Sequence, residues 1–254
     1  MRIVDLSAPI EPSPEGTLDV LRTEVEYSDH AEGAAVIEQL FGVGPELLRD
    51  GEGWANDFFT RFGTHNSTHV DAPYHYNSKI QGEPAQTIDE LPLEWFVNPG
   101  VVLDFDGRED GHAIDVVDVE AALDAAGHDL QPLDIVLVRT GCDRWIDQAE
   151  YMAHGPGVTG PATEWLYERG IRVMGIDAWG WDRPLWMQAE EAKQSGEKGI
   201  FWEAHQVDLP YSQIERLVNL GELPPTGFTV SCLPLPLVGG SAAPARVVAM
   251  IGDP

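Results

Sequence analysis

Three histidines and one aspartate lie close together in the segment RFGTHNSTHVDAPYHY, residues 61–76. They are His65, His69, Asp71 and His75. Imidazole and carboxylate groups are ligands that suit both Zn²⁺ and Mn²⁺, and an incomplete protein shell leaves room for water. The cluster therefore predicts a divalent metal site. The alternative is a histidine-rich surface loop, or core histidines bonded to backbone carbonyls.

The local sequence determines how these side chains can converge. Residues 66–67 and Pro73 disfavour a helix through the cluster. In an extended segment, side chains two residues apart point to the same face, so His69 and Asp71 should face one point. A bend at 66–67 lets the first histidine reach that point too. His75 follows the proline that stiffens the turn, which could place it beside the metal rather than on it.

A second source of ligands is present downstream. The segment FWEAHQVDLPYSQIERLVNL, 201–220, contains His205 and Glu215, with Glu203 nearby. On its own this signal is weak, because QIERLVNL is typical of a short helix that would carry Glu215 on its solvated face. The remaining histidines, at positions 30, 112, 128 and 154, lie in polar or acidic segments and predict no site.

Other common catalytic patterns are missing from the sequence. It contains no G-x-S-x-G motif, no dinucleotide-binding G-x-G-x-x-G and no P-loop. Cys142 and Cys232 have no histidine neighbour that would support a thiol nucleophile. Two cysteines are too few for a disulfide framework, so we expect buried thiols in a reducing cytoplasm.

Composition narrows the range of partners. The 254 residues carry a formal net charge of −28, from 43 acidic and 15 basic side chains. Such a field repels phosphate backbones and anionic lipids, so neither a nucleic-acid nor a membrane partner is expected. No long apolar run or signal peptide is evident, which predicts a cytoplasmic protein. The acidity fits either salt adaptation or ordinary solubility.

Strand and helix signals alternate in the middle of the chain. The helix predicted over 115–127 begins after an Asp cap and ends in Gly, and that over 159–170 has a Thr cap and an early Pro. The Gly-Pro pair in 33–50 limits any helix there to short turns. These signals predict one α/β domain over 1–254 with a mixed sheet. Its strands are expected at 2–7, 100–106, 133–140 and 171–177, and in 227–240 and 245–252, the last two joined by a Gly-rich turn.

The segment HNSTHVDAPYH resembles the H-x-G-T-H-x-D-x-P-x-H signature of the metal-dependent cyclase-like hydrolases, which include bacterial kynurenine formamidase and isatin hydrolase. DLSAPI, GIDAWGWDRP, FWEAH and IERLVNLGELPPTGFTV also resemble segments of that family, so the similarity covers most of the chain. Ser67 departs from the signature, which usually has Gly there. If that position requires a positive φ, Ser is strained in it.

The resemblance implies a fold, a site and an assembly. The fold would be a compact α/β domain with a mixed sheet and a small β-barrel-like core, assembled as a homodimer or homotetramer. His75 would transfer protons. One or two Zn²⁺ or Mn²⁺ ions per subunit would be bound by His65, His69, Asp71, His205 and Glu215.

The resemblance also implies hydrolysis of a cyclic amide, a formyl amide or a lactone. Tryptophan-rich segments, DAWGWDRPLW and GIFWEAH, suggest an aromatic pocket wall and a planar or aromatic substrate, although core packing would explain them equally well. A polyketide cyclase with the same metal site is the alternative enzyme. A metal-binding member of the family without catalysis is the other alternative.

Overall fold

The computed structural model describes residues 1–17 and 19–252. Backbone contacts group them into two compact units, one formed by 1–9 together with 67 onward, the other by Ile10–Asn66. We call these the sheet unit and the 10–66 unit and describe each by itself. The single domain expected over 1–254 stays a prediction.

The secondary structure contains both short and long elements, together with several 3-10 turns. The helices are α1 His30–Phe41, α2 Pro73–Tyr76, α3 Val116–Ala126, α4 Gly160–Glu168 and α5 Leu185–Ser195. The strands are β1 Arg2–Asp5, β2 Glu24–Glu26, β3 Phe58–Arg61, β4 His69–Asp71, β5 Lys79–Ile80, β6 Glu83–Pro84, β7 Val97–Asp104, β8 Ala113–Ile114, β9 Ile135–Arg139, β10 Gly157–Val158, β11 Val173–Ile176, β12 Ser212–Glu215, β13 Phe228–Ser231, β14 Ala242–Pro244 and β15 Val248–Ile251.

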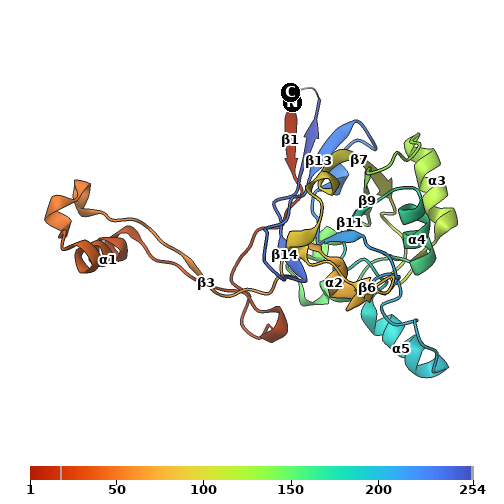
Figure 1. Cartoon of the computed structure of the whole chain (residues 1–254), viewed down its shortest axis with the longest axis horizontal. Coiled ribbons are helices and arrows are strands. Elements are labelled where there is room, and N and C mark those ends of the chain that lie inside the picture. Colours follow the sequence, from red (N-terminus) through yellow and green to blue (C-terminus); the bar gives the residue numbers. More distant parts are fainter. Residues whose placement is uncertain (18, 253–254) are drawn as a thin grey trace. The chain divides into compact units, whose positions relative to one another are not determined.

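A curled mixed sheet of nine strands dominates the sheet unit, in the order β1-β15-β13-β7-β9-β11-β12-β4-β14 (Figure 1). The four central strands, β7, β9, β11 and β12, run parallel to one another. The pairings on both sides of this centre are antiparallel. The predicted α/β fold with a mixed sheet is confirmed.

Helices α3 and α4 connect the parallel strands and lie side by side on one face of the sheet (Figure 1). Asp115 caps α3 by accepting a hydrogen bond from the Asp118 amide, and Gly127 ends it in the left-handed conformation at φ 64°. Thr159 caps α4 by accepting from the Ala162 amide. Both helices begin where the cap residues predict.

The central strands are buried on both faces. Val101 and Leu103 belong to the core beneath α3 and α4, whereas Val102 belongs to a second core on the opposite face. This double burial explains the continuous apolar runs 100–103 in β7 and 135–138 in β9, since alternation with polar residues is needed only where one face meets water.

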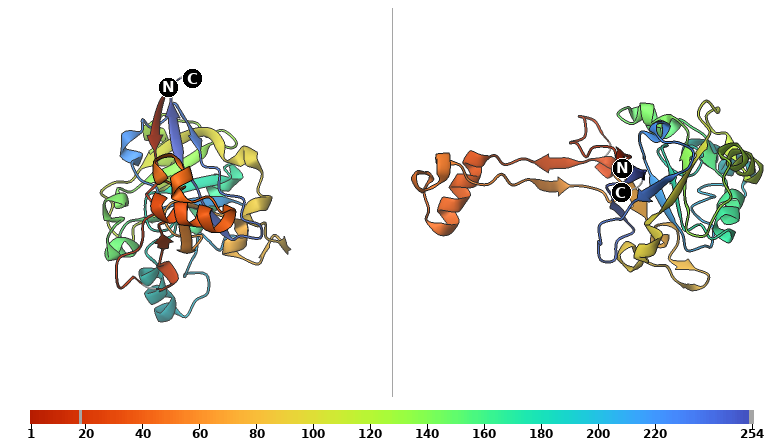
Figure 2. Two further views of the ribbon diagram at one scale, coloured as in Figure 1. Left: turned by 90° about the vertical axis from the view of Figure 1, so that its left-hand side faces the viewer. Right: turned by 90° about the horizontal axis from the view of Figure 1, so that it is seen from above.

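The strands near the termini and the metal-site motif pair over long distances in sequence. β1 pairs antiparallel with β15, which places the first and the last strand of the sheet unit beside each other (Figure 2). The connection between β13 and β15 is more than the Gly-rich turn that the sequence predicts, because it contains β14. β14 pairs with β4, so this connection completes one side of the strand that carries His69 and Asp71.

The 10–66 unit contains α1 and a two-stranded ribbon of β2 and β3. The expectation of short turns only is wrong, because α1 runs for 12 residues. Asp29 and Glu32 form a capping box at its start, and Gly42 ends it at φ 69°. The Gly-Pro pair that was expected to break the helix follows its end.

Within the described residues, none of the helices combines the length and the apolar character that a membrane span requires.

Candidate metal centre

Two neighbouring strands bring four polar side chains to one face of the sheet. β4 pairs antiparallel with β12, so Asp71 lies opposite Gln213 and His69 lies opposite Glu215. Directly opposed residues project to the same face, and the two-residue spacing puts His69 and Asp71 there together. All four side chains are buried.

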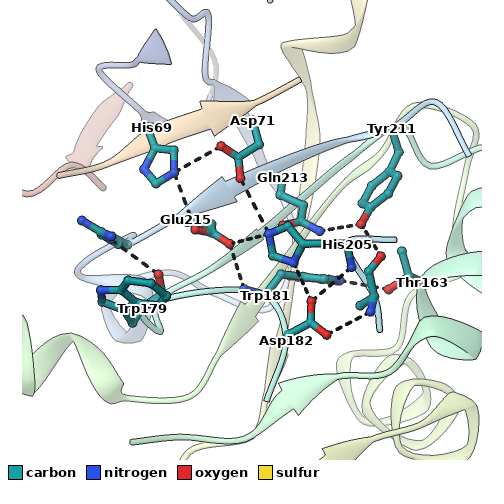
Figure 3. A network of polar contacts seen from close by, with 12 residues as sticks. His69, Asp71, Thr163, Trp179, Trp181, Asp182, His205, Tyr211, Gln213 and Glu215 are labelled. Carbon is teal, nitrogen blue, oxygen red and sulfur yellow. Dashed lines mark hydrogen bonds and ion pairs between the residues drawn. The ribbon is translucent and has the colours of Figure 1, made fainter. Parts of the chain in front are cut away.

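Three of these groups form a compact set of metal-ligand type (Figure 3). The Nε2 atom of His69 lies 3.3 Å from Asp71 Oδ1 and 3.6 Å from Glu215 Oε2. One ligand atom from each of the three residues lies within 4.8 Å of the others. Two carboxylates and one imidazole are a donor set that Zn²⁺ and Mn²⁺ both accept.

The tautomer of His69 that its backbone contact favours suits a cation in this set. Its Nδ1 atom lies 2.9 Å from the carbonyl oxygen of Ser67. Because a carbonyl oxygen only accepts, Nδ1 carries the hydrogen, and the lone pair of Nε2 faces the two carboxylates. Burying three acceptors against one another is costly unless a metal ion or a proton lies among them. The residues present therefore fit a divalent ion.

The pKa of His69 reports the same field. Burial lowers this pKa, but the carboxylates of Asp71 and Glu215 outweigh burial, so the net direction is upward. Burial and the charge of Asp71 raise the pKa of Glu215, whereas His205 and His69 lower it, and the net direction is downward. The pocket is thus strongly negative and attracts positive charge.

His205 enters the centre from the segment between α5 and β12. Its Nε2 atom lies 3.3 Å from Glu215 Oε1 and 4.0 Å from Asp71 Oδ2. The other ring nitrogen, Nδ1, lies 2.5 Å from Asp182 Oδ2, and the His205 backbone amide donates to the same oxygen at 3.1 Å. Burial lowers the pKa of His205, but Asp182 and Glu215 raise it to about 10.

Asp182 supports His205 from behind and was not singled out from the sequence. Its Oδ1 atom accepts hydrogen bonds from the Ala204 amide and from Gln188 Nε2, both at 2.9 Å. Gln188 Oε1 accepts in turn from the Trp202 amide. Such a carboxylate behind a ligand histidine holds its tautomer and ring orientation. The buried acid in the segment GIDAWGWDRP was the available signal.

Glu215 lies on a strand and not on the short helix that the sequence favours. Its Oε1 atom accepts a hydrogen bond of 3.0 Å from the Trp181 amide. The Glu215 side chain is 8% exposed, which is far from the solvated position expected of a helix surface. The strand pairing, which joins residues far apart in sequence, overrides the local helical pattern.

His75 stands in an aromatic setting beside the centre. It belongs to the single-turn helix α2, and its ring packs edge-on against Trp202, with centroids 5.1 Å apart. Trp202 also stacks on His205 at 4.6 Å. A ring nitrogen of His75 lies within 4.8 Å of an Asp71 carboxylate oxygen. His75 therefore lies close to the candidate ligands.

The remaining candidates from the sequence are His65 and Glu203, alongside three further histidines and the two cysteines. His65 belongs to the 10–66 unit, four residues before His69, and stays a predicted ligand. Glu203 accepts a hydrogen bond from the backbone of Gly160. The histidines at 112, 128 and 154 each pair with one aspartate, at 3.2, 2.8 and 2.9 Å. Both cysteines are buried and free, as predicted.

Ser67 adopts a positive φ of 56°, the conformation that favours glycine. Its hydroxyl donates to the carbonyl oxygens of Ala8 and Pro9 at 3.1 and 3.3 Å. The same residue supplies the carbonyl that orients His69. The strain therefore lies at the turn that presents the first ligand strand.

Several known proteins are similar to this chain in sequence or in fold. The chain is 30% identical over 193 residues to kynurenine formamidase from Salinibacter ruber, covering 74% of this chain and 76% of that protein. The structure of isatin hydrolase A from Ralstonia solanacearum matches with a TM-score of 0.75 and 27% identity, over 99% of this chain and 92% of that one. A structure described as a potential metal-dependent hydrolase with cyclase activity shares the fold, with a TM-score of 0.64 and 24% identity over 100% of this chain and 99% of that one.

Residues 4–183 match the family model described as "Putative cyclase". The chain belongs to this family.

Proposed function

We propose that the protein is a metal-dependent hydrolase that cleaves an amide bond, in a ring or in a formyl amide, with a lactone ester as the related substrate to test. The observation that carries the proposal is the buried convergence of Asp71, Glu215 and the lone pair of His69 Nε2. The similarity to enzymes named kynurenine formamidase and isatin hydrolase supports hydrolysis over polyketide cyclisation.

Each candidate ligand has its own role in metal binding. Asp71 and Glu215 supply charge, and His69 and His205 supply neutral imidazole nitrogens. His65 completes the site for one or two Zn²⁺ or Mn²⁺ ions. A bound divalent ion supplies Lewis acidity, which activates water and polarises the substrate carbonyl. Asp182 keeps the Nε2 atom of His205 directed at the centre.

His75 acts as the acid and base. A ring nitrogen takes the proton from the attacking water and returns it to the leaving nitrogen or oxygen. The edge-on contact with Trp202 fixes the imidazole plane and leaves its nitrogens at the ring edge. A positioned imidazole of this kind contributes roughly 10²–10⁴-fold to the rate.

The proposed substrate is planar or aromatic. Trp179 and Trp202 are half-buried near Glu215 and His205, so their rings are available to a ligand. Trp181 is fully buried and donates to Thr163 Oγ1, which makes it part of the core. The tryptophan-rich segment thus divides between ligand contact and packing.

We also propose that the chain assembles with copies of itself. The 10–66 unit exposes Leu40, Phe41, Phe58 and Phe59, each by more than half of its surface. Exposed large apolar side chains are enriched at interaction surfaces. A second copy satisfies this surface in a homodimer or homotetramer.

The decisive experiment begins with metal content. Protein purified without added metal is analysed for Zn and Mn, then tested with isatin, N-formylkynurenine, simple lactones and cyclic imides. We expect stoichiometric metal and turnover of at least one amide. Protein that binds neither metal stoichiometrically, or metal-loaded protein that hydrolyses none of these compounds, would contradict the proposal.

The His75→Ala variant separates hydrolysis from metal binding alone. Its turnover should fall by roughly 10²–10⁴-fold, since the proton carrier is lost. Its metal content should remain that of the wild type. Full activity in this variant would show that the role assigned to His75 is wrong.

A further inference from the structure

Arg216 follows the ligand-bearing strand directly and is unusual in its backbone. Its φ is 58°, in the left-handed region that favours glycine. The turn is held from both sides, because the Arg216 amide donates to the Ala178 carbonyl at 3.2 Å and its carbonyl accepts from Thr68 Oγ1 at 2.6 Å. A long cationic side chain is therefore retained at a position where a residue without a side chain would be relaxed.

The guanidinium of Arg216 has few partners for a half-buried cation. Its carbon lies 5.0 Å from the centre of the Trp179 ring, and Nε donates to the Trp179 carbonyl at 3.5 Å. Within the described parts of the chain, 1–17 and 19–252, no carboxylate lies at ion-pair distance from it. Most of its five N–H donors are thus left for another acceptor.

The charge of Arg216 acts on the metal centre. It lowers the pKa of His69, and Glu215 and Asp71 act on the pKa of Arg216 in return. Burial lowers the pKa of Arg216 in the first place, so placing the cation there has a cost. A cation next to the ligands, stacked on a half-buried tryptophan, has the chemistry of a carboxylate receptor, since a guanidinium pairs with a carboxylate through two parallel hydrogen bonds.

We propose that Arg216 binds a carboxylate group of the ligand and thereby sets the specificity of the site. The inference rests on the proposed function because that function places the ligand at the centre. The binding test itself does not depend on it. The carboxylate has two sources: it belongs to the substrate from the start, or it forms when a cyclic amide is opened.

Equilibrium binding tests the proposal without requiring turnover. Benzoate and its neutral isostere benzamide are titrated into metal-loaded full-length protein by calorimetry. The variants are Arg216→Gly, which suits the left-handed turn, and Arg216→Lys, which keeps the charge but loses the two parallel N–H donors of the guanidinium. Arg169→Gln is the matched control, because Arg169 also stacks on a tryptophan, Trp165, and donates to its carbonyl.

We expect Arg216→Gly to weaken benzoate binding by roughly 10–100-fold, as expected for loss of a charged hydrogen-bond pair. Benzamide binding should change less than about twofold, and Arg216→Lys should be intermediate. Arg169→Gln should match the wild type. Metal content and melting temperature should not fall in Arg216→Gly, because glycine relaxes the turn.

Three results would overturn the inference: no saturable benzoate binding to the wild type, unchanged benzoate binding in Arg216→Gly, or an equal loss for benzamide. The last would indicate a structural cation. N-formylanthranilate, formanilide and isatin separate the two sources of the carboxylate. A rise in KM for N-formylanthranilate alone assigns the carboxylate to the substrate, and weaker inhibition by the acid formed from isatin assigns it to the product. If no amide is hydrolysed, the proposed function fails while the benzoate result still decides the role of Arg216.

Discussion

The sheet unit and the 10–66 unit differ in how far they bury their apolar side chains. The sheet unit buries valine, leucine and isoleucine on both faces of its central strands. Among the described residues of 10–66, Ala34 alone is a buried apolar residue, whereas Leu40 is 63% and Phe59 is 60% exposed. The unit that carries its own core also carries the candidate metal centre, and the other exposes large apolar side chains.

Close backbone packing, and not a core, holds the 10–66 unit together. A Cβ atom on Gly33 would lie 1.7 Å from the carbonyl oxygen of Trp54, so only glycine fits there. The Gly53 amide donates to the His30 carbonyl at 2.9 Å. Contacts of this kind fix a local shape without removing much apolar area from water.

The largest expected effect is a loss of metal affinity on substitution in the sheet unit, compared with no loss on substitution in the 10–66 unit. Asp71→Asn removes a buried charge at the centre. Loss of a residue that only supports a ligand lowers metal affinity by up to about 100-fold, so loss of a ligand itself should lower it by more. Activity should be lost with it. Asp50→Asn, an exposed acid of the 10–66 unit, is the control and should leave both unchanged. Equilibrium dialysis measures the affinity, and wild-type metal binding by Asp71→Asn would break the comparison.

The next effect concerns stability and pH in the sheet unit. Burial raises the pKa of Asp177 to about 7, even though Thr140 and Gly141 donate hydrogen bonds to it. Its pKa in the unfolded chain is lower, about 3.9. The folded protein therefore binds more protons between these values, and its unfolding free energy decreases as pH rises through this window. The full change is at most about 4 kcal/mol.

Urea unfolding at pH 5 and pH 8 measures this slope. Asp177→Asn should show a smaller decrease than the wild type, although it starts from a lower stability because its amide nitrogen meets the Gly141 amide. Asp124→Asn, an exposed acid on α3, should keep the wild-type slope. Equal slopes in all three proteins would assign the pH dependence to the general negative charge.

Asp182→Asn should have a moderate effect. It keeps the shape of the side chain but removes the charge behind His205 Nδ1, so metal affinity should fall by roughly 10–100-fold. Chelator competition measures this affinity. Asp110→Asn is the control, since Asp110 pairs with His154 away from the centre. Unchanged metal affinity in Asp182→Asn would mean that the carboxylate does not position a ligand.

The smallest expected effect on unfolding lies in the 10–66 unit. Replacing Phe58 and Phe59 by serine should change the unfolding free energy by less than about 0.5 kcal/mol, since both are exposed. The same change should shift the protein to smaller assemblies in analytical ultracentrifugation. The control Val117→Ser, at an exposed position of α3, should leave the assembly state unchanged. An unaltered sedimentation profile in the double variant would show that β3 does not form the interface.

Much of the fold could be predicted because its signals are local. The caps at Asp115 and Thr159 fix where α3 and α4 begin, and the apolar sequences of β7 and β9 report burial on both faces. The capping box of Asp29 was equally local but was overlooked beside the Gly-Pro pair. β14 could not be predicted, since Ala-Ala-Pro has no strand signal until β4 pairs with it.

The candidate site was predictable where spacing alone sets geometry. His69 and Asp71 share a face because a strand has a period of two. Glu215 and Asp182 required tertiary structure: Glu215 faces His69 only through the β4–β12 register, and Asp182 reaches His205 across two loops. Arg216 became notable only when its backbone conformation was known.

The register of β4 also bears on how the chain folds. Its partners, Gln213 on β12 and Ala242 on β14, pair with Asp71 across most of the sequence. Closing such long loops costs entropy before any contact repays it, and folding is slow where contacts are distant. β4 should therefore join the sheet late. A metal ion that binds only the finished centre would then act after the rate-limiting step, slowing unfolding more than it speeds folding.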